Sequence, residues 1–159
     1  MKKITRRILS FLMTAVMMAS AAALAVNAAS TGTYIKDISE IPTSYLKTYY
    51  ADFINRADLS NGGIDCVEFC YAKDQNHIKS GQNHNSLCFI VAADDMSNYS
   101  LYEYADIKKD SNGKLLPATY KGKTKSFNSE DKMWKYLDNT YQYCPFGNGT
   151  IYEIANSIS

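Results

Sequence analysis

Two residues of this chain have side chains that could support nucleophilic catalysis. Cys66 follows Gly63-Ile64-Asp65, where a helix could begin, and a thiol in the first turn of a helix has a lowered pKa that favours the reactive thiolate. His84 comes 18 residues later and could be the base that takes the proton of the thiol. The pair indicates one candidate function, a secreted cysteine hydrolase of peptide or cell-wall amide bonds.

The segment Asp65-Cys66-Val67-Glu68-Phe69 resembles the nucleophile motif of the secreted papain-like cell-wall peptidases, which are α+β domains. The resemblance implies Cys66 as the nucleophile, and the residue that would orient a base stays unknown. The chain departs from the family at Val67, where a Ser is usual. It departs again in the short interval before His84, which leaves no room for the strand that the family places there.

The four cysteines predict disulfides instead, because an even number of cysteines in an exported domain is typical of a disulfide framework. Cys66 and Cys70 would lie about 13 Å apart in a strand and would be poorly oriented for a bridge in a helix. We therefore expect two disulfides that join Cys66 and Cys70 each to Cys88 or Cys144. Free thiols are the alternative, and they would favour the hydrolase.

The first 28 residues predict export. Four basic residues precede an apolar run from Ile8 to Val26, and the small residues Val26 and Ala28 stand at the positions that a signal peptidase reads. We expect a signal peptide over residues 1–28, an extracellular protein and no stable membrane anchor after cleavage. An uncleaved anchor is the alternative, because the run is long enough to cross a bilayer.

Composition argues against two further classes of function. Without the basic residues of the signal, 13 Lys and Arg face 16 Asp and Glu, so the net charge is near −3 and nucleic-acid binding is not expected. Cys66, Cys70, His77 and His84 have intervals outside those of zinc fingers, and we expect neither a metal nor another cofactor.

Tyrosine is the unusual residue of this composition, since the chain has 13 of them. Tyr side chains suit contact surfaces because they combine a flat apolar face with a hydroxyl group. Tyr102 and Tyr104 share one face of a predicted hairpin, and with Tyr99 they are the predicted ligand-binding residues. The first hypothesis for function is a secreted, non-catalytic binding module for an extracellular glycan, peptide or protein.

Periodicity and turn signals predict the elements that must position these residues. We expect a tether over residues 29–40 and a single domain over 41–159. The domain would hold a helix after Pro42, a central strand over 87–93 and a helix that follows Ser129, includes Cys144 and ends at Pro145. A hairpin would join 99–107 to 115–121 through Asp110-Ser111-Asn112-Gly113, and a last strand would cover 151–154.

Residues 64–72 are ambiguous. Alternating Val67, Phe69 and Tyr71 favour a strand, whereas Asp65 and Glu68 form a capping-box pattern that favours a helix through Ile78. We favour the helix. The predicted fold is α+β, with two or three helices packed on a small, mostly antiparallel sheet stapled by disulfides.

Overall fold

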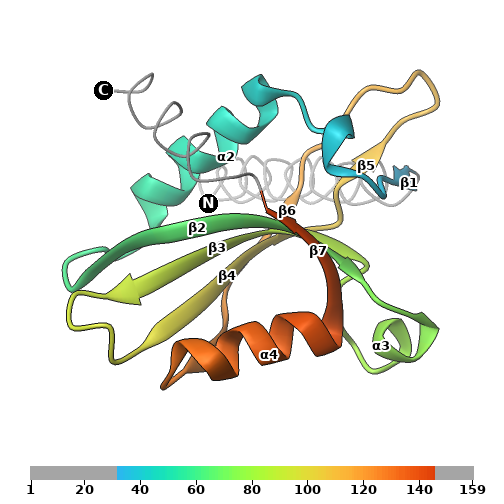
Figure 1. The fold of residues 1–159 in the computed structure, drawn as a ribbon. Coiled ribbons are helices and arrows are strands. Elements are labelled where there is room, and N and C mark those ends of the chain that lie inside the picture. Colours follow the sequence, from blue (N-terminus) through green and yellow to red (C-terminus); the bar gives the residue numbers. More distant parts are fainter. Residues whose placement is uncertain (1–31, 146–159) are drawn as a thin grey trace, which may run out of the picture. The chain divides into compact units, whose positions relative to one another are not determined.

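The computed structural model of this protein describes residues 32–145. In chain order and as labelled in Figure 1, the elements are β1 (Thr33–Tyr34), the 3-10 helix η1 (Ile38–Glu40), α2 (Thr43–Arg56), β2 (Gly62–Ala72), α3 (Gln75–Lys79), β3 (Asn85–Ala93), β4 (Tyr99–Ala105), β5 (Lys108–Lys109), β6 (Thr119–Phe127), α4 (Glu130–Thr140) and β7 (Tyr141–Pro145). The predicted signal peptide (1–28) and last strand (151–154) lie outside the described residues. Within the predicted tether, Ile35 is buried.

A curled antiparallel sheet dominates this fold. Its five strands follow the order β6-β4-β3-β2-β7 and curl into a half-barrel. The predicted fold class, helices on a small sheet held by disulfides, is therefore wrong. The physical reason is that two segments expected to be helical, residues 65–72 and the stretch after Thr140, pair with each other as strands β2 and β7.

Residues 34–108 and 117–145 form one compact unit, which contains the whole five-stranded sheet and its helices. Residues 109–116 belong to a second unit of the chain. There the Asp110 carboxylate accepts hydrogen bonds of 2.9 Å from the backbone N–H groups of Asn112 and Lys114, and Gly113 has a left-handed φ of 79°. The turn predicted at this position is confirmed.

β2 is a strand because both of its edges are paired. Antiparallel β3 lies on one side, with Val67 opposite Phe89, and β7 lies on the other, with Phe69 opposite Cys144. The preference for a helix over residues 65–78 was wrong, and the strand alternative is confirmed. The capping pattern of Asp65 and Glu68 lost to β-branched and aromatic side chains that fit between two neighbouring strands.

The strand predicted over 87–93 is the central strand β3, and it is covered on both faces. Figure 1 shows α2 on one face of the sheet and α4 on the other. On the α2 face, the ring of Phe53 stacks on that of Phe89 with 4.5 Å between the centroids. On the α4 face, Met133 and Leu137 pack against Ile90 and the rest of a second cluster. The sheet therefore has two apolar layers.

Both long helices agree with their sequence signals. α2 begins after Pro42 and buries Leu46, Tyr50 and Phe53 at helical spacing. The side chain of Ser129 caps α4 by accepting a hydrogen bond from the backbone N–H of Lys132. α4 is shorter than predicted, because Tyr141 already has extended backbone angles and begins β7.

No disulfide can form as predicted, because Cys66, Cys70 and Cys88 are all free. Both expected bridges required Cys66 or Cys70. On β2 these two residues flank Glu68, and it is Glu68 that lies in register with Cys88. The thiols of Cys70 and Cys88 are in hydrogen-bond contact in the core, where both residues are 0% exposed. Burial raises the pKa of Cys88, which keeps this thiol protonated.

Candidate functional site

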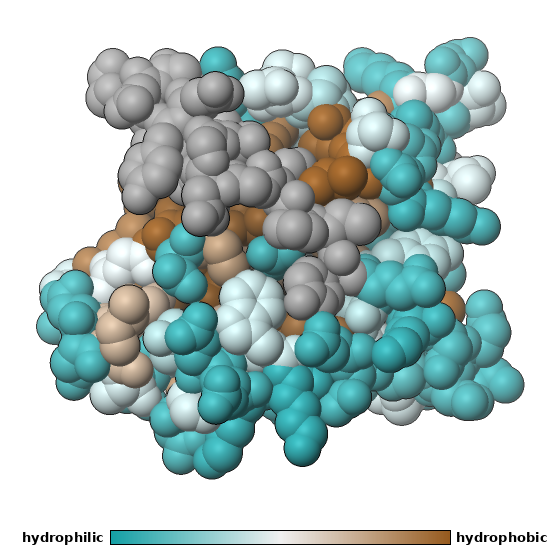
Figure 2. Space-filling model, viewed as in Figure 1, coloured by the Kyte–Doolittle hydropathy of each residue, from teal (hydrophilic) through white to brown (hydrophobic). Residues whose placement is uncertain are grey.

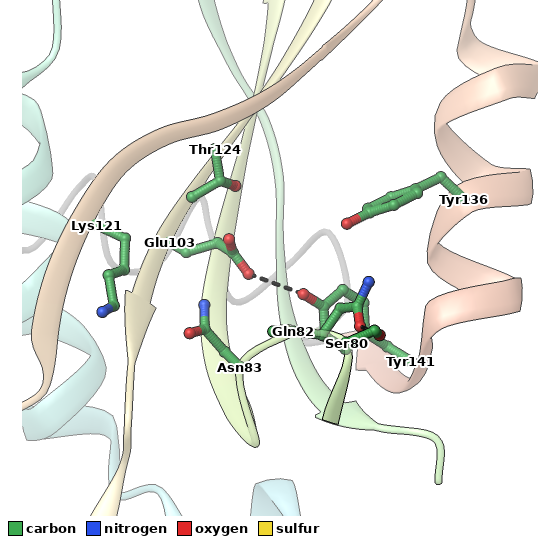
Figure 3. A pocket seen from close by; sticks show the side chains of 9 residues that line it. Ser80, Gln82, Asn83, Glu103, Lys121, Thr124, Tyr136 and Tyr141 are labelled. Carbon is green, nitrogen blue, oxygen red and sulfur yellow. Dashed lines mark hydrogen bonds between the residues drawn. The ribbon is translucent and has the colours of Figure 1, made fainter. Parts of the chain in front are cut away.

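A polar pocket opens on the α4 side of the sheet and has a volume of about 390 Å³. Figure 3 shows side chains from four parts of the chain pointing into it: the loop after α3, strand β4, strand β6 and the junction of α4 with β7. The lining residues are Ser80, Gly81, Gln82, Asn83, Glu103, Lys121, Thr124, Tyr136 and Tyr141. The volume lies in the range of small-molecule sites, and the lining is suited to a polar ligand.

Glu103 is the chemically distinctive residue of this pocket. Its side chain projects from β4 toward the cavity, yet the residue is only 3% exposed. The hydroxyl of Tyr141 donates a 3.1 Å hydrogen bond to its Oε1, and the thiol of Cys88 lies 4.0 Å from the same oxygen. Both donors are neutral. A carboxylate buried among neutral donors is a costly arrangement, and such groups are usually paired or functional.

The two tyrosines beside Glu103 keep their hydroxyl protons. Burial and the negative charge of Glu103 raise the pKa of Tyr141 far above its ordinary value, and the same two causes raise the pKa of Tyr136. Figure 3 shows the Tyr136 hydroxyl turned toward the carboxylate. The pocket thus combines one strong acceptor with hydroxyl groups that can donate.

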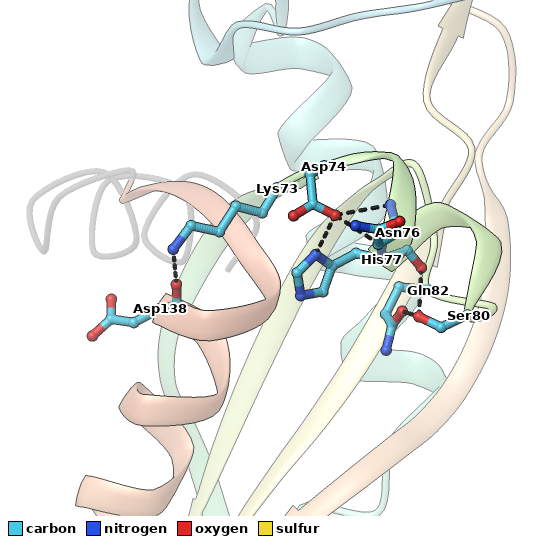
Figure 4. A network of polar contacts seen from close by, with 7 residues as sticks. All are labelled: Lys73, Asp74, Asn76, His77, Ser80, Gln82 and Asp138. Carbon is cyan, nitrogen blue, oxygen red and sulfur yellow. Dashed lines mark hydrogen bonds and ion pairs between the residues drawn. The ribbon is translucent and has the colours of Figure 1, made fainter.

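The loop after α3 supplies amide groups and is held by a local polar network (Figure 4). Asp74 caps α3: its Oδ1 accepts from the backbone N–H of His77 at 3.0 Å and lies 2.7 Å from the imidazole Nδ1 of the same residue. After the helix, the single hydroxyl hydrogen of Ser80 has two acceptors within reach, the carbonyl oxygen of His77 and the side-chain oxygen of Gln82. These contacts fix the backbone from which Gln82 and Asn83 reach the pocket.

β6 forms the opposite wall. Thr124 donates a 3.4 Å hydrogen bond to the carbonyl of Leu101, and Lys121 lines the pocket beside it. In Figure 3 the Lys121 ammonium points away from Glu103. The ion pairs among residues 32–145 do not include Glu103. Lys125, farther along the strand, lies over the ring of Tyr136 with Nζ 4.6 Å from the centroid.

A second carboxyl group lies on the same face of the sheet. Glu68 on β2 is opposite Cys88 on β3, and Cys88 is opposite Glu103 on β4, so the three residues form one row across neighbouring strands. Glu68 is 3% exposed, and its Oε2 has no hydrogen-bond partner. Burial raises its pKa to about 7, and a hydrogen bond with Cys66 opposes part of that rise.

The predicted ligand-binding tyrosines do not form an exposed surface. Tyr99 is 4% exposed and Tyr104 1% exposed, and only Tyr102 is half-buried. Tyr104 donates a 2.7 Å hydrogen bond to Asp52 of α2, and its ring contacts that of Phe89. β4 pairs with a strand that follows the turn, as predicted, but that strand is β6 at Thr119–Phe127 and not residues 115–121. The Tyr102 face of the hairpin packs under α2 instead of facing solvent.

The predicted Cys66–His84 pair is not assembled. Cys66 is a strand residue, and His84 accepts a hydrogen bond through its carbonyl from Ala72, six residues further along β2. Six strand residues span about 20 Å. His84 Nε2 instead lies 2.7 Å from the hydroxyl of Tyr71. Burial and the neighbouring Glu68 raise the pKa of Cys66, the opposite of what a nucleophile requires.

Sequence reasoning passed over the pocket residues. No motif in the sequence separates Glu103 from the other acidic residues of the chain, and Gln82 and Asn83 lie in a polar stretch between His77 and His84. One signal was present. Glu103 alternates with Leu101 and Ala105 on a single strand face, so if that face is buried, the carboxylate must be buried with it.

Comparisons with protein-family models, curated proteins and solved structures find no match to this chain. Among the described residues, no group of acidic, histidine and cysteine side chains could hold a metal ion, and no helix is long and apolar enough to cross a membrane. The large apolar side chains that are well exposed in this part of the chain are Ile54 and Met96. Figure 2 shows mainly hydrophilic side chains over α4 and α3.

Proposed function

We propose that this protein is a secreted, non-catalytic binding module whose pocket on the α4 side of the sheet takes a saccharide. The buried carboxylate of Glu103 at the base of the pocket carries this proposal. Sugars present many hydroxyl groups that must each find a partner when they leave water. A pocket that offers a carboxylate, two amides and several hydroxyl groups within about 390 Å³ matches that need.

Each wall of the pocket has a role in such binding. Glu103 can accept two sugar hydroxyl groups more strongly than a neutral acceptor could, because hydrogen bonds to a charged group are stronger. The amides of Gln82 and Asn83 can both donate and accept, and Thr124 adds a hydroxyl from the facing strand. The residues lie on a sheet strand and on a capped, hydrogen-bonded loop, so the groups are held before the ligand arrives.

Binding is favoured over the alternative of cysteine hydrolysis for a geometric reason. Cys66 lies on β2, whereas His84 is hydrogen-bonded to Ala72 at the far end of that strand, and its imidazole contacts the hydroxyl of Tyr71. The Tyr-rich surface of the first hypothesis is also replaced, because Tyr102 and Tyr104 pack on the α2 face and Tyr99 is buried in the cluster on the α4 face. Within residues 32–145, the pocket beside Glu103 offers a polar ligand a set of convergent hydrogen-bonding groups.

The experiment is an NMR titration of the ¹⁵N-labelled protein with a panel of neutral monosaccharides and disaccharides. We expect shift changes that cluster at residues 80–83, 121–124 and 136–141. Thr124→Ala should weaken binding, whereas Thr48→Ala should not. Thr48 is a matched control, because it is an exposed residue of α2 and its hydroxyl also donates to a backbone carbonyl. A panel that gives no binding, or shifts that cluster on α2, would refute the proposal.

A further inference from the structure

We infer that the ligand of this pocket carries an ammonium group, and that it is an amino sugar with its amine directed at Glu103. This inference rests on the proposed function, because it names the class of saccharide that the same pocket takes. It starts from an imbalance of charge. Glu103 is 3% exposed, and its two nearest donors, the hydroxyl of Tyr141 and the thiol of Cys88, are both neutral.

Removal of a carboxylate from water is unfavourable in free energy unless a cation or several hydrogen bonds compensate it. No Lys, Arg or His lies within 4.0 Å of Glu103 in the part of the chain that the structure describes. Lys121, the basic residue that lines the pocket, points away, and Lys125 lies over the ring of Tyr136. Neither of these lysines neutralises Glu103, so a cationic group of the ligand can do so.

The row of residues on the sheet strengthens the preference for a cation. Glu68 lies two strands from Glu103, and both carboxyl groups act on the thiol of Cys88 between them. A cation at the base of the pocket is therefore attracted by Glu103 and, when Glu68 is ionised, by a second negative charge. An ammonium group also has three N–H donors. One donor can bond to Glu103, which leaves two for other acceptors among the residues that line the pocket, such as the amide of Asn83.

The rest of the pocket suits a sugar ring. Hydroxyl groups beside the amine would face Thr124 and Ser80 on the two walls, and Tyr136 closes the side toward α4. A long alkylamine, such as a lysine side chain, would leave these polar groups without partners. The amino sugar is for this reason the occupant that uses both the charge and the polar walls.

The test compares glucosamine, glucose and N-acetylglucosamine, which differ at one carbon, in calorimetric titrations at mildly acidic pH. We expect glucosamine to bind at least about tenfold more tightly than glucose, because its ammonium group adds the attraction of opposite charges to the hydrogen bond that a sugar hydroxyl could also donate to Glu103. Glu103→Gln should remove this preference and leave weak binding of glucose. Thr124→Ala should weaken both sugars by the same factor. Added salt should reduce the preference in the unmodified protein, which keeps the inference testable if Glu103→Gln does not fold.

The outcomes separate the inference from the proposed function. Equal binding of glucose and glucosamine, or tightest binding of N-acetylglucosamine, would overturn the inference that the ligand carries an ammonium group. The proposal that the pocket binds a saccharide would still stand. Binding of Nα-acetyl-lysine amide, whose side-chain amine is free, together with no binding of any sugar would overturn the saccharide assignment. A preference that survives Glu103→Gln would show that another group selects the amine, and it would overturn the role given to Glu103.

Discussion

The hydroxyl of Tyr141 donates a 3.1 Å hydrogen bond to Oε1 of Glu103, although 38 residues separate them in the chain. This bond joins the point where α4 ends to the middle of β4, and it lies at the base of the pocket. The strand β7 that starts at Tyr141 is paired with β2, not with β4. The bond therefore crosses the curled face of the sheet, which makes the pocket dependent on the correct docking of α4.

Tyr141→Phe should destabilise the protein by about 1–3 kcal/mol, because the ring still packs while the buried carboxylate loses its hydroxyl donor. Glu103→Gln alone should change the free energy of unfolding little or increase it, since it removes a buried charge that has no cation partner. Combined with Glu103→Gln, Tyr141→Phe should cost only about 1 kcal/mol. Urea unfolding of the four proteins measures this double-mutant cycle, and strictly additive effects would show that the bond does not couple the two residues.

Much of this architecture could be predicted from local pattern. The helices at 43–56 and 130–140, the central strand and the β4–β6 hairpin all follow from periodicity and caps. Residues 64–72 could not be decided locally, because the capping residues and the alternating aromatic residues favoured different structures. Pairing with β3 and with β7 decided the outcome, and those partners lie far away in the sequence.

The site was harder to predict than the fold, for a reason visible in β4. Its alternation separates Tyr102 and Tyr104 from Leu101 and Glu103, but alternation cannot show whether one face or both faces are covered. Here α2 covers the tyrosine face and α4 covers part of the other. The tyrosines became core residues, and the acidic residue that looked like ordinary surface became the base of a pocket.

Cys66, Cys70 and Cys88 should be free thiols in both the native and the unfolded protein. Without reductant in concentrated guanidinium chloride, iodoacetamide should label Cys66, Cys70 and Cys88 fully. In the native protein Cys70 and Cys88 should stay unlabelled, because both are 0% exposed, and Cys66 should react slowly, because burial raises its thiol pKa. Peptide mapping by mass spectrometry gives the result, and a peptide pair joined through any of these three residues would contradict it.

Glu68 should make the stability depend on pH. In the folded protein burial raises its pKa from the ordinary 4.5 to about 7, so between these values the folded state binds more protons than the unfolded state. The free energy of unfolding should therefore fall as pH rises from about 4.5 to about 7, by up to about 3 kcal/mol, and this contribution should level off above that range. Glu68→Gln should flatten the profile, whereas Asp138→Asn on the exposed side of α4 should not.

Gly62 and Gly63 at the start of β2 allow a test of how closely β2 and β3 pack, because only one of the two positions has room for a side chain. A Cβ at Gly62 would collide with the backbone carbonyl oxygen of Ala92 on β3 and lie 3.0 Å from the Cα of Ala93. A Cβ at Gly63 would have no heavy atom within 4 Å. Backbone atoms of a paired strand cannot move aside as a flexible side chain can, so the first collision must separate the strands or distort them.

Gly62→Ala should therefore lower the free energy of unfolding by about 1–3 kcal/mol, the usual cost of overpacking. Gly63→Ala should have no such cost and can gain up to about 1 kcal/mol, because alanine restricts the unfolded chain more than glycine does. Urea unfolding of both variants separates the steric effect from the loss of a glycine, because each variant adds one methyl group and the two positions are neighbours in the chain. Equal stability of the two variants would mean that β2 and β3 do not approach as closely at this end as their pairing requires.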